Sequence, residues 1–204
     1  MTKNDFKKEL ASYRARKGRF DIVEVPPLQY LMIDGHGDPN TSPEFATAVE
    51  ALYPLAYGLK FASKTALGRD YAVMPLEGLW WADDHTSFTS ARDKNTWHWT
   101  LMILQPDWID AGMCADAVAK ASGKSPRVGE VRLETLEEGL CAQTLHVGPY
   151  DDEAPLLEQM HDDFIPEQGM RMTGTHHEIY FSDPRRGDPA KRRTLLRQPV
   201  EPVS

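Results

Sequence analysis

The residue types best suited to chemistry in this chain lie in the β-prone segment from Thr175 to Phe181. Side chains alternate between the two faces of a strand, so His176, Glu178 and Tyr180 should share one face. A glutamate in mid-strand among aromatic residues is unusual, because Glu is depleted in strands and is costly to bury. Burial disfavours the charged form of a carboxyl group and suits it to general acid or base catalysis near neutral pH. Glu178 is therefore a candidate catalytic residue.

A second glutamate, Glu77, occupies a similar place in the segment MPLEGLWW (74–81), where aromatic residues again follow it. We expect Glu77 to line the same ligand site or to mirror Glu178 by duplication. Both glutamates also have a simpler interpretation, as rim carboxylates paired with an arginine such as Arg132 or Arg193. The sequence leaves these interpretations open.

Tryptophan is the second unusual feature, because all five tryptophans of the chain fall within residues 80–108. An indole offers a large flat surface and one N–H donor, which suits the wall of a pocket for planar ligands. It suits a hydrophobic core equally well, and both roles stay open. The tryptophans are Trp80, Trp81, Trp97, Trp99 and Trp108.

Other kinds of site find little support. No histidine pairs with another His or with Cys at a metal-ligand spacing, so we expect no metal. The chain lacks a Gly-x-Ser-x-Gly elbow, and neither cysteine stands in a recognisable nucleophile context. Gly148-Pro149-Tyr150 is typical of a turn, from which the Tyr150 hydroxyl can project into a cleft.

Composition narrows the class of protein. The chain has 204 residues, with 23 Lys and Arg against 31 Asp and Glu, which gives a net charge of −8. This acidic balance argues against a nucleic-acid binder, because phosphate contacts need Lys and Arg. We expect no membrane span or secretory signal, because no long apolar run is present. Two cysteines are too few for a disulfide framework, so we expect a cytoplasmic protein.

The elements that must position these residues follow from hydrophobic periodicity and turn signals. A helix is expected over 5–17, and another begins at Thr41, which has a capping-box spacing to Glu44. Pro54 should kink or end that second helix. A connector helix should run from about 106 to 121, and Asp152 should cap a further helix. Strands are expected at 28–34, 71–81, 96–104, 130–136, 140–147, 175–181 and 193–198.

These elements occur in a similar order in the two halves of the chain. Each half has a strand, a Gly-containing turn, a capped helix and then two strands. An internal duplication with antiparallel sheets and helices on one face would be an α+β architecture. A ligand cleft between the two halves is then expected.

Several stretches together resemble the stand-alone members of the GyrI-like small-molecule-binding family, and they cover nearly the whole chain beyond Phe20. The stretches are VEVPPLQYLMIDGHGDPN (23–40), MPLEGLWW (74–81), WHWTLMILQPDW (97–108), HVGPYDDE (146–153), HHEIYFSDPRR (176–186) and TLLRQPV (194–200).

The resemblance implies a fold of two SHS2-type β-α-β-β modules with pseudo-twofold symmetry around a cleft for hydrophobic ligands. Residues 1–20 would form an N-terminal helical extension and residues 21–204 a single domain. Its first half would be about 21–105, its connector helix about 107–122 and its second half about 129–200. The extension is too short for the DNA-binding module that some family members carry, so no DNA binding is expected.

Some stand-alone relatives are hydrolases that open the cyclopropane ring of DNA-alkylating cyclopropanoid toxins. The resemblance assigns their cleft glutamate to Glu178, with Tyr150 or Tyr180 as hydrogen-bond donor to the developing phenolate. It implies no cofactor. The alternative is a non-catalytic drug binder, or a gyrase-inhibitor-like protein with a protein partner. The residues expected to contact an aromatic ligand are Glu77, Trp80, Trp81, Trp99, Trp108 and His176.

Overall fold

The computed structural model describes residues 3–82, 94–182 and 188–203, so residues 183–186 of the last glutamate-containing stretch lie outside the described part. Backbone contacts divide the chain into two compact units, which are described separately. Unit 1 comprises Met1–Glu9, Leu28–Met74 and Trp81–Leu136, and unit 2 comprises Leu10–Pro27, Pro75–Trp80 and Glu137–Ser204. The domain boundaries expected from the sequence stay a prediction.

The sheet of unit 1 is built on β3 (Leu28–His36), which pairs antiparallel with β6 (His98–Gln105) on one side and β7 (Arg132–Leu136) on the other. Most apolar side chains of β3 and β6 are buried, as expected for strands that pack under a helix, whereas β7 is only partly buried. The strands predicted at 28–34, 96–104 and 130–136 are thus confirmed.

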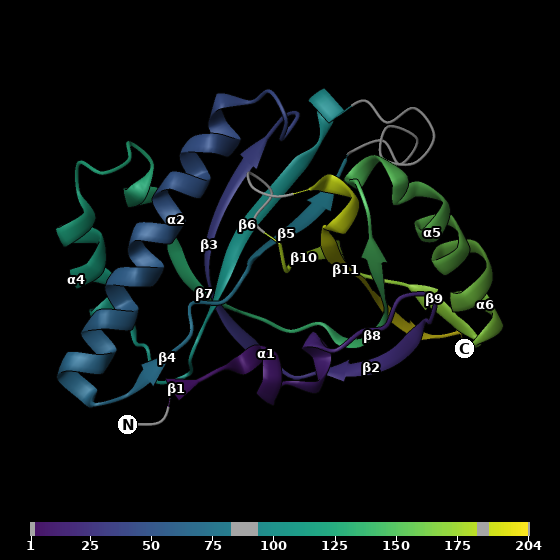
Figure 1. Ribbon diagram of the computed structural model, residues 1–204, viewed down its shortest axis with the longest axis horizontal. Coiled ribbons are helices and arrows are strands. Elements are labelled where there is room, and N and C mark those ends of the chain that lie inside the picture. The colour runs from purple at the N-terminus through teal and green to yellow at the C-terminus, as the bar shows by residue number, and fades with distance from the viewer. Residues whose placement is uncertain (1–2, 83–93, 183–187, 204) are drawn as a thin grey trace. The chain divides into compact units, whose positions relative to one another are not determined.

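Helix α2 (Pro43–Ala62) covers this sheet, with Leu52, Leu55 and Leu59 fully buried (Figure 1). The predicted capping box at Thr41 is wrong, because the helix begins after Ser42, which makes no side-chain capping bond. Pro54 does not end the helix either, although it lacks an N–H for the helical ladder. Burial of the surrounding apolar residues outweighs the loss of that one hydrogen bond.

Helix α4 (Ala111–Ala121) packs against α2. It begins later than predicted, because the Asp110 side chain accepts a hydrogen bond from Met113 N and caps it. The remaining elements of unit 1 are short: β1 (Lys3–Asn4), α1 (Phe6–Glu9), the π-helical turn Ser63–Leu67, β4 (Asp70–Tyr71), and the 3-10 turns Lys94–Thr96 and Val128–Glu130.

The helix predicted over 5–17 is wrong. The segment forms only α1 and, in unit 2, a 3-10 turn at Ala11–Tyr13, after which Arg14 is extended. Its backbone carbonyls find partners other than a helical ladder, since Ser12 O accepts from Arg197 and Arg14 O from Gln143. These bonds satisfy the backbone and remove the need for a continuous helix.

The sheet of unit 2 has five antiparallel strands in the order β2, β8, β11, β10, β5. The strands predicted at 140–147, 175–181 and 193–198 are confirmed, whereas 71–81 splits into β4 and β5, and β2 was not predicted. The bounds are β2 Asp21–Val25, β8 Gly139–Val147, β11 Arg193–Pro202, β10 His176–Tyr180 and β5 Leu76–Trp81, with β9 (Met170–Met172) paired to the end of β11.

Strand alternation gives this sheet two faces. The site face carries Gly78 and Trp80 of β5, His176, Glu178 and Tyr180 of β10, Thr194 of β11, and Thr144 and His146 of β8. The back face carries Glu77 of β5, His177 of β10, Arg197 of β11 and Gln143 of β8.

Helical segments pack on one end of the site face. Met160 and Ile165 contact Ala142 and Val200 in a buried apolar cluster. The segments are the 3-10 turn Tyr150–Asp152, α5 (Ala154–Glu158), the π-helical turn Gln159–Phe164 and α6 (Ile165–Glu167). Asp152 does not cap α5 as predicted, because Glu153 occupies the N-cap position and makes no side-chain capping bond.

The chain is therefore a mixed α+β protein whose main sheets are antiparallel. Within the described ranges, no helix combines the length and the apolar character needed to cross a membrane.

Candidate functional site

Glu178 stands at the centre of a polar cluster on the site face, with a side chain that is 15% exposed. The Tyr180 hydroxyl donates a hydrogen bond to Glu178 Oε2 at 2.7 Å, and His176 Nε2 lies 3.3 Å from Glu178 Oε1. The predicted common face of these three residues is thus confirmed. The carboxylate has a partner at each of its two oxygens, and the side chain as a whole stays partly exposed.

Trp80 extends the cluster. Its indole N–H donates to the Tyr180 hydroxyl at 2.9 Å, so the Tyr180 oxygen accepts from Trp80 and its one hydrogen is directed to Glu178. Gly78 makes room for this indole, because a Cβ at Gly78 would lie 2.7 Å from Trp80 Nε1. Trp80, Tyr180 and Glu178 therefore form one chain of hydrogen bonds.

The Tyr180 hydroxyl is a permanent donor in this chain. Burial raises the pKa of Tyr180 well above its ordinary value of 10.0, and the negative charge of Glu178 raises it further. The Tyr150 ring meets the Tyr180 ring edge-on, with centroids 5.7 Å apart. The Arg192 guanidinium lies 5.1 Å from the Tyr150 ring centroid. The predicted catalytic residues Glu178, Tyr150 and Tyr180 thus lie together.

Sequence analysis missed three residues around this cluster. Glu153 is almost fully buried, and its charge also raises the pKa of Tyr180, after burial and Glu178. The His161 ring lies 6.2 Å from the His176 ring. Thr194 is fully buried and pairs with Tyr180 in the sheet, and its Oγ1 has no hydrogen-bond partner among the described residues. Glu153 lies within the stretch HVGPYDDE, which was a usable signal.

Glu77 does not join Glu178. It lies on the back face, fully buried, where the Tyr13 hydroxyl donates to its Oε1 at 2.5 Å and His177 Nε2 lies 3.0 Å from its Oε2. The strand register explains this placement, because Gly78 and not Glu77 stands opposite Glu178.

The arginines considered as partners for these glutamates have other contacts. Arg132 pairs with Asp34 and Glu134 at 2.8 Å each, within unit 1. The Arg193 guanidinium lies over the Phe181 ring, 5.8 Å from its centroid.

The other predicted tryptophans belong to unit 1. Trp99 is fully buried, packs over Gly35 and donates to Gly37 O at 3.2 Å. Trp108 donates to Ser63 Oγ at 3.0 Å. Trp81 is 38% exposed and stacks on the His98 ring. Trp99 and Trp108 thus have core contacts, and Trp80 is the tryptophan whose described contacts reach Tyr180.

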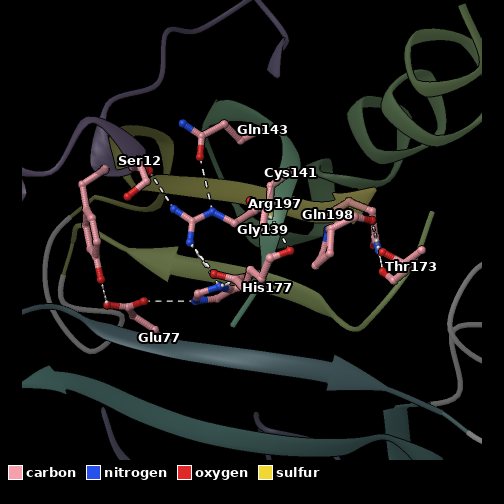
Figure 2. Close-up of polar contacts among 12 residues, drawn as sticks. Ser12, Glu77, Gly139, Cys141, Gln143, Thr173, His177, Arg197 and Gln198 are labelled. Carbon is pink, nitrogen blue, oxygen red and sulfur yellow. Dashed lines mark hydrogen bonds and ion pairs between the residues drawn. The ribbon is translucent and has the colours of Figure 1, made fainter. Parts of the chain in front are cut away.

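The back face holds a charged cluster that the sequence did not reveal. Arg197 and His177 are fully buried there, and both contact Glu138. Figure 2 shows the further contacts of His177 with Glu77 and of Arg197 with Gln143. The arginine in the apolar stretch TLLRQPV could have indicated this cluster, because Arg is almost never fully buried without a charged partner.

Metal ligation has no basis in the described part of the chain, where no three or more His, Cys, Asp or Glu side chains are grouped so that they could hold an ion.

Known structures resemble this chain over nearly its full length. An uncharacterized conserved protein from Listeria innocua is 38% identical, with 98% of this chain and 100% of that chain covered and a TM-score of 0.87. A hydrolase from Listeria innocua is also 38% identical, with the same coverage and a TM-score of 0.83. The C-terminal domain of EcmrR is 15% identical over 91% of this chain and 98% of that domain, with a TM-score of 0.54, and shows the fold alone.

No curated protein sequence matches the chain. The family model for the GyrI-like small molecule binding domain matches residues 19–201, which include the strands of unit 2 except the last residue of β11, and the whole cluster around Glu178. Because the match spans nearly the entire chain, the protein belongs to the GyrI-like small-molecule-binding domain family.

Proposed function

We propose that this chain binds hydrophobic planar small molecules at the site face of unit 2 and hydrolyses cyclopropanoid compounds there. The observation that carries the proposal is the partly exposed Glu178 carboxylate, held by the Tyr180 hydroxyl and approached by His176. A carboxylate oriented in this way can act as a general base toward a bound water molecule. The 38% identity to a hydrolase from Listeria innocua supports a hydrolytic reaction.

The reaction adds one water molecule to a cyclopropane fused to a dienone. The water oxygen bonds to the cyclopropane CH₂, the ring C–C bond breaks, and its electron pair moves through the dienone to the carbonyl oxygen, which becomes a phenolate. Glu178 accepts the water proton, and this proton finally reaches the phenolate to give a neutral phenol. Every atom and charge is thereby balanced without a cofactor.

The hydrogen-bond directions give Tyr180 and Tyr150 different roles. The one hydrogen of Tyr180 is directed to Glu178, so Tyr180 orients the base. Tyr150, whose ring packs against Tyr180, is then the hydroxyl assigned to the developing phenolate. Trp80 is only 5% exposed and fixes the Tyr180 hydroxyl through its indole N–H.

The test is to incubate the purified protein with a duocarmycin-type spirocyclopropane and to follow the ring-opened product by mass spectrometry. Glu178→Gln should lower turnover by about 10²–10⁴-fold, the usual contribution of a general base. Binding, measured by quenching of tryptophan fluorescence, should persist. Glu201→Gln, which changes a 47% exposed glutamate paired with Arg171, is the matched control and should leave turnover unchanged.

Non-catalytic binding is the second candidate, favoured by the family itself, which is defined by small-molecule binding. Fluorescence quenching without any ring-opened product would support a drug-sequestering or gyrase-inhibitor-like protein. A Glu178→Gln variant that still turns over the compound would remove Glu178 from the mechanism.

The physiological role that follows from hydrolysis is detoxification, and hence drug resistance, by a cytoplasmic protein with small-molecule and not nucleic-acid partners. The duplicated SHS2-type modules with pseudo-twofold symmetry, and a ligand cleft between them, stay predictions of the family resemblance. The proposal rests on residues of unit 2 alone.

A further inference from the structure

The back face of the unit 2 sheet carries a set of connected, buried polar contacts. Arg197 donates to Glu138 Oε2 at 2.8 Å, to Ser12 O at 2.7 Å and to Gln143 Oε1 at 3.3 Å (Figure 2). His177 lies between two carboxylates, with Nδ1 2.9 Å from Glu138 Oε1 and Nε2 3.0 Å from Glu77 Oε2. These side chains are at most 3% exposed.

The geometry of His177 fixes its protonation state. Each ring nitrogen faces a carboxylate oxygen, and a carboxylate only accepts hydrogen bonds. Between two ionised carboxylates both nitrogens carry hydrogen, and this arrangement makes the ring an imidazolium. Arg197 Nη1 is also near Nδ1, but at 3.5 Å it is farther than the Glu138 oxygen at 2.9 Å, and the carboxylate is the stronger partner.

With Glu77 and Glu138 both ionised, the charges of the cluster balance when His177 is an imidazolium. Arg197 and His177 supply two positive charges, and Glu138 and Glu77 supply two negative charges. A neutral His177 would leave one uncompensated negative charge in the interior and would turn a ring lone pair toward a carboxylate. The other polar groups that face the cluster are the Tyr13 hydroxyl on Glu77 and the Cys141 thiol beside Glu138 O.

The His177–Glu77 contact on the back face and the Trp80–Tyr180 hydrogen bond on the site face are centred on the same pair of residues in the sheet. Glu178 of β10 stands opposite Gly78 of β5. On the back face, Glu77 and His177 lie one residue to either side of this pair and join the two strands diagonally. On the site face, Trp80 and Tyr180 lie two residues to either side of the same pair and also join the strands diagonally. A change in strand spacing at this point therefore moves both contacts.

We propose that protonated His177 is a positioning residue, which clamps β5 to β10 from the back face and so sets the Trp80–Tyr180–Glu178 chain on the site face. This inference rests on the proposed function only in taking Glu178 as the reactive carboxylate. His177 touches neither ligand nor reacting atoms and acts through the strand pair.

The proton on His177 defines the pH range of the clamp. Burial lowers the pKa of His177, but the charge and hydrogen bond of Glu138 and the hydrogen bond of Glu77 outweigh burial and raise the pKa above the ordinary 6.5. A raised folded-state pKa stabilises the protein fully below the unfolded pKa, and this stability is lost as pH rises through the folded pKa. The clamp should hold at neutral pH and open on the alkaline side.

The test is NMR of the ¹⁵N-labelled free protein across neutral and alkaline pH, which needs neither ligand nor turnover. At pH 7.5, taken as about one pH unit above the ordinary His pKa, both ring nitrogens of His177 should be protonated. As His177 loses its proton, the Trp80 indole N–H signal should move with the same midpoint. The Trp99 indole, which donates to Gly37 O in unit 1, is the internal control and should not follow. His177→Asn and Trp80→Phe assign the signals.

A neutral His177 ring at pH 7.5 would overturn the inference. So would a Trp80 indole N–H signal that does not change as His177 titrates. Glu138→Gln removes one facing carboxylate and should lower the midpoint by about 1–3 pH units. Glu134→Gln, at an exposed position in unit 1, should leave this midpoint unchanged.

Where the spirocyclopropane is turned over, kcat should fall on the alkaline side at the same midpoint. Coupled NMR titrations without any turnover would refute hydrolysis and leave the clamp standing.

Discussion

The two faces of the unit 2 sheet differ in the partners that hold a carboxylate. On the back face, Glu138 is held by the cations Arg197 and His177, and these outweigh burial and lower the pKa of Glu138 to about 2. On the site face, Glu178 is held by the neutral Tyr180 hydroxyl and by His176. The two faces alternate along the same strand, so adjacent residues of β10 serve different purposes.

This difference in partners suits one carboxylate to a structural role and the other to a chemical role. A carboxylate paired with two cations is a poor proton acceptor, because the cations stabilise its charged form. A neutral hydroxyl donor stabilises the charged form of a carboxylate less than two cations do, and the Glu178 side chain is also 15% exposed. The back face is therefore suited to fixing the strands, and the site face to accepting a ligand and a proton.

The largest expected effect comes from breaking the back face with Arg197→Met. The substitution removes a fully buried cation and leaves Glu138 with one partner fewer. Removing one partner of a buried ion pair costs about 3–5 kcal/mol of unfolding free energy. Urea denaturation measures the loss. The control Arg171→Met breaks an exposed pair with Glu201 and should cost about 1 kcal/mol or less. Equal losses in the two variants would contradict a structural role for the back face.

Tyr180→Phe breaks the site face and should have a smaller effect on stability. It removes the hydroxyl that accepts from the buried Trp80 indole and donates to Glu178, so two buried hydrogen bonds are lost. The expected cost is about 2 kcal/mol in urea denaturation. Turnover should fall as well, but by less than in Glu178→Gln, because Tyr180 orients the base and does not accept the proton. Tyr57→Phe, at a 48% exposed site, should change neither quantity.

Gly78→Ala tests the shape of the site face without removing a polar group. The added Cβ would lie 2.7 Å from Trp80 Nε1, so the indole must shift away from Tyr180. Overpacking of this kind costs about 1–2 kcal/mol. The change in the Trp80 indole N–H signal reports the shift directly. Gly58→Ala in α2 is the control, because its methyl meets nothing within 4 Å and should not destabilise the helix. An unmoved Trp80 signal would show that Gly78 is not needed for the indole.

The part of the site that sequence predicts is the part set by one strand. Period-two alternation places His176, Glu178 and Tyr180 on one face whatever their neighbours are. Glu178 can be recognised for the same reason, because its residue type and its neighbours along the strand are read directly from the sequence.

The part that sequence does not predict depends on how strands pair. Glu77 and Glu178 have similar local patterns, yet the β5–β10 register sets Gly78 opposite Glu178 and sends Glu77 to the back face. The cluster of Glu138, His177 and Arg197 joins residues far apart in the chain, so no local pattern reveals it. A one-residue difference in register decides which face a side chain occupies, and local sequence does not encode it.

The smallest expected effect, and the one with an unusual sign, is that of Thr194→Val. Thr194 Oγ1 is buried on the site face and has no hydrogen-bond partner among the described residues, so replacing the hydroxyl by a methyl group should leave stability unchanged or raise it by up to about 1 kcal/mol. Thr144→Val on the same face is the matched comparison. Thr144 Oγ1 donates to Arg19 O at 2.9 Å, so its loss should destabilise the protein. Thermal unfolding of the two variants measures the difference, and equal destabilisation would mean that the Thr194 hydroxyl does make a hydrogen bond. If Thr194→Val keeps its stability but binds the spirocyclopropane more weakly, the hydroxyl serves the ligand, which would extend the site face from Glu178 toward β11.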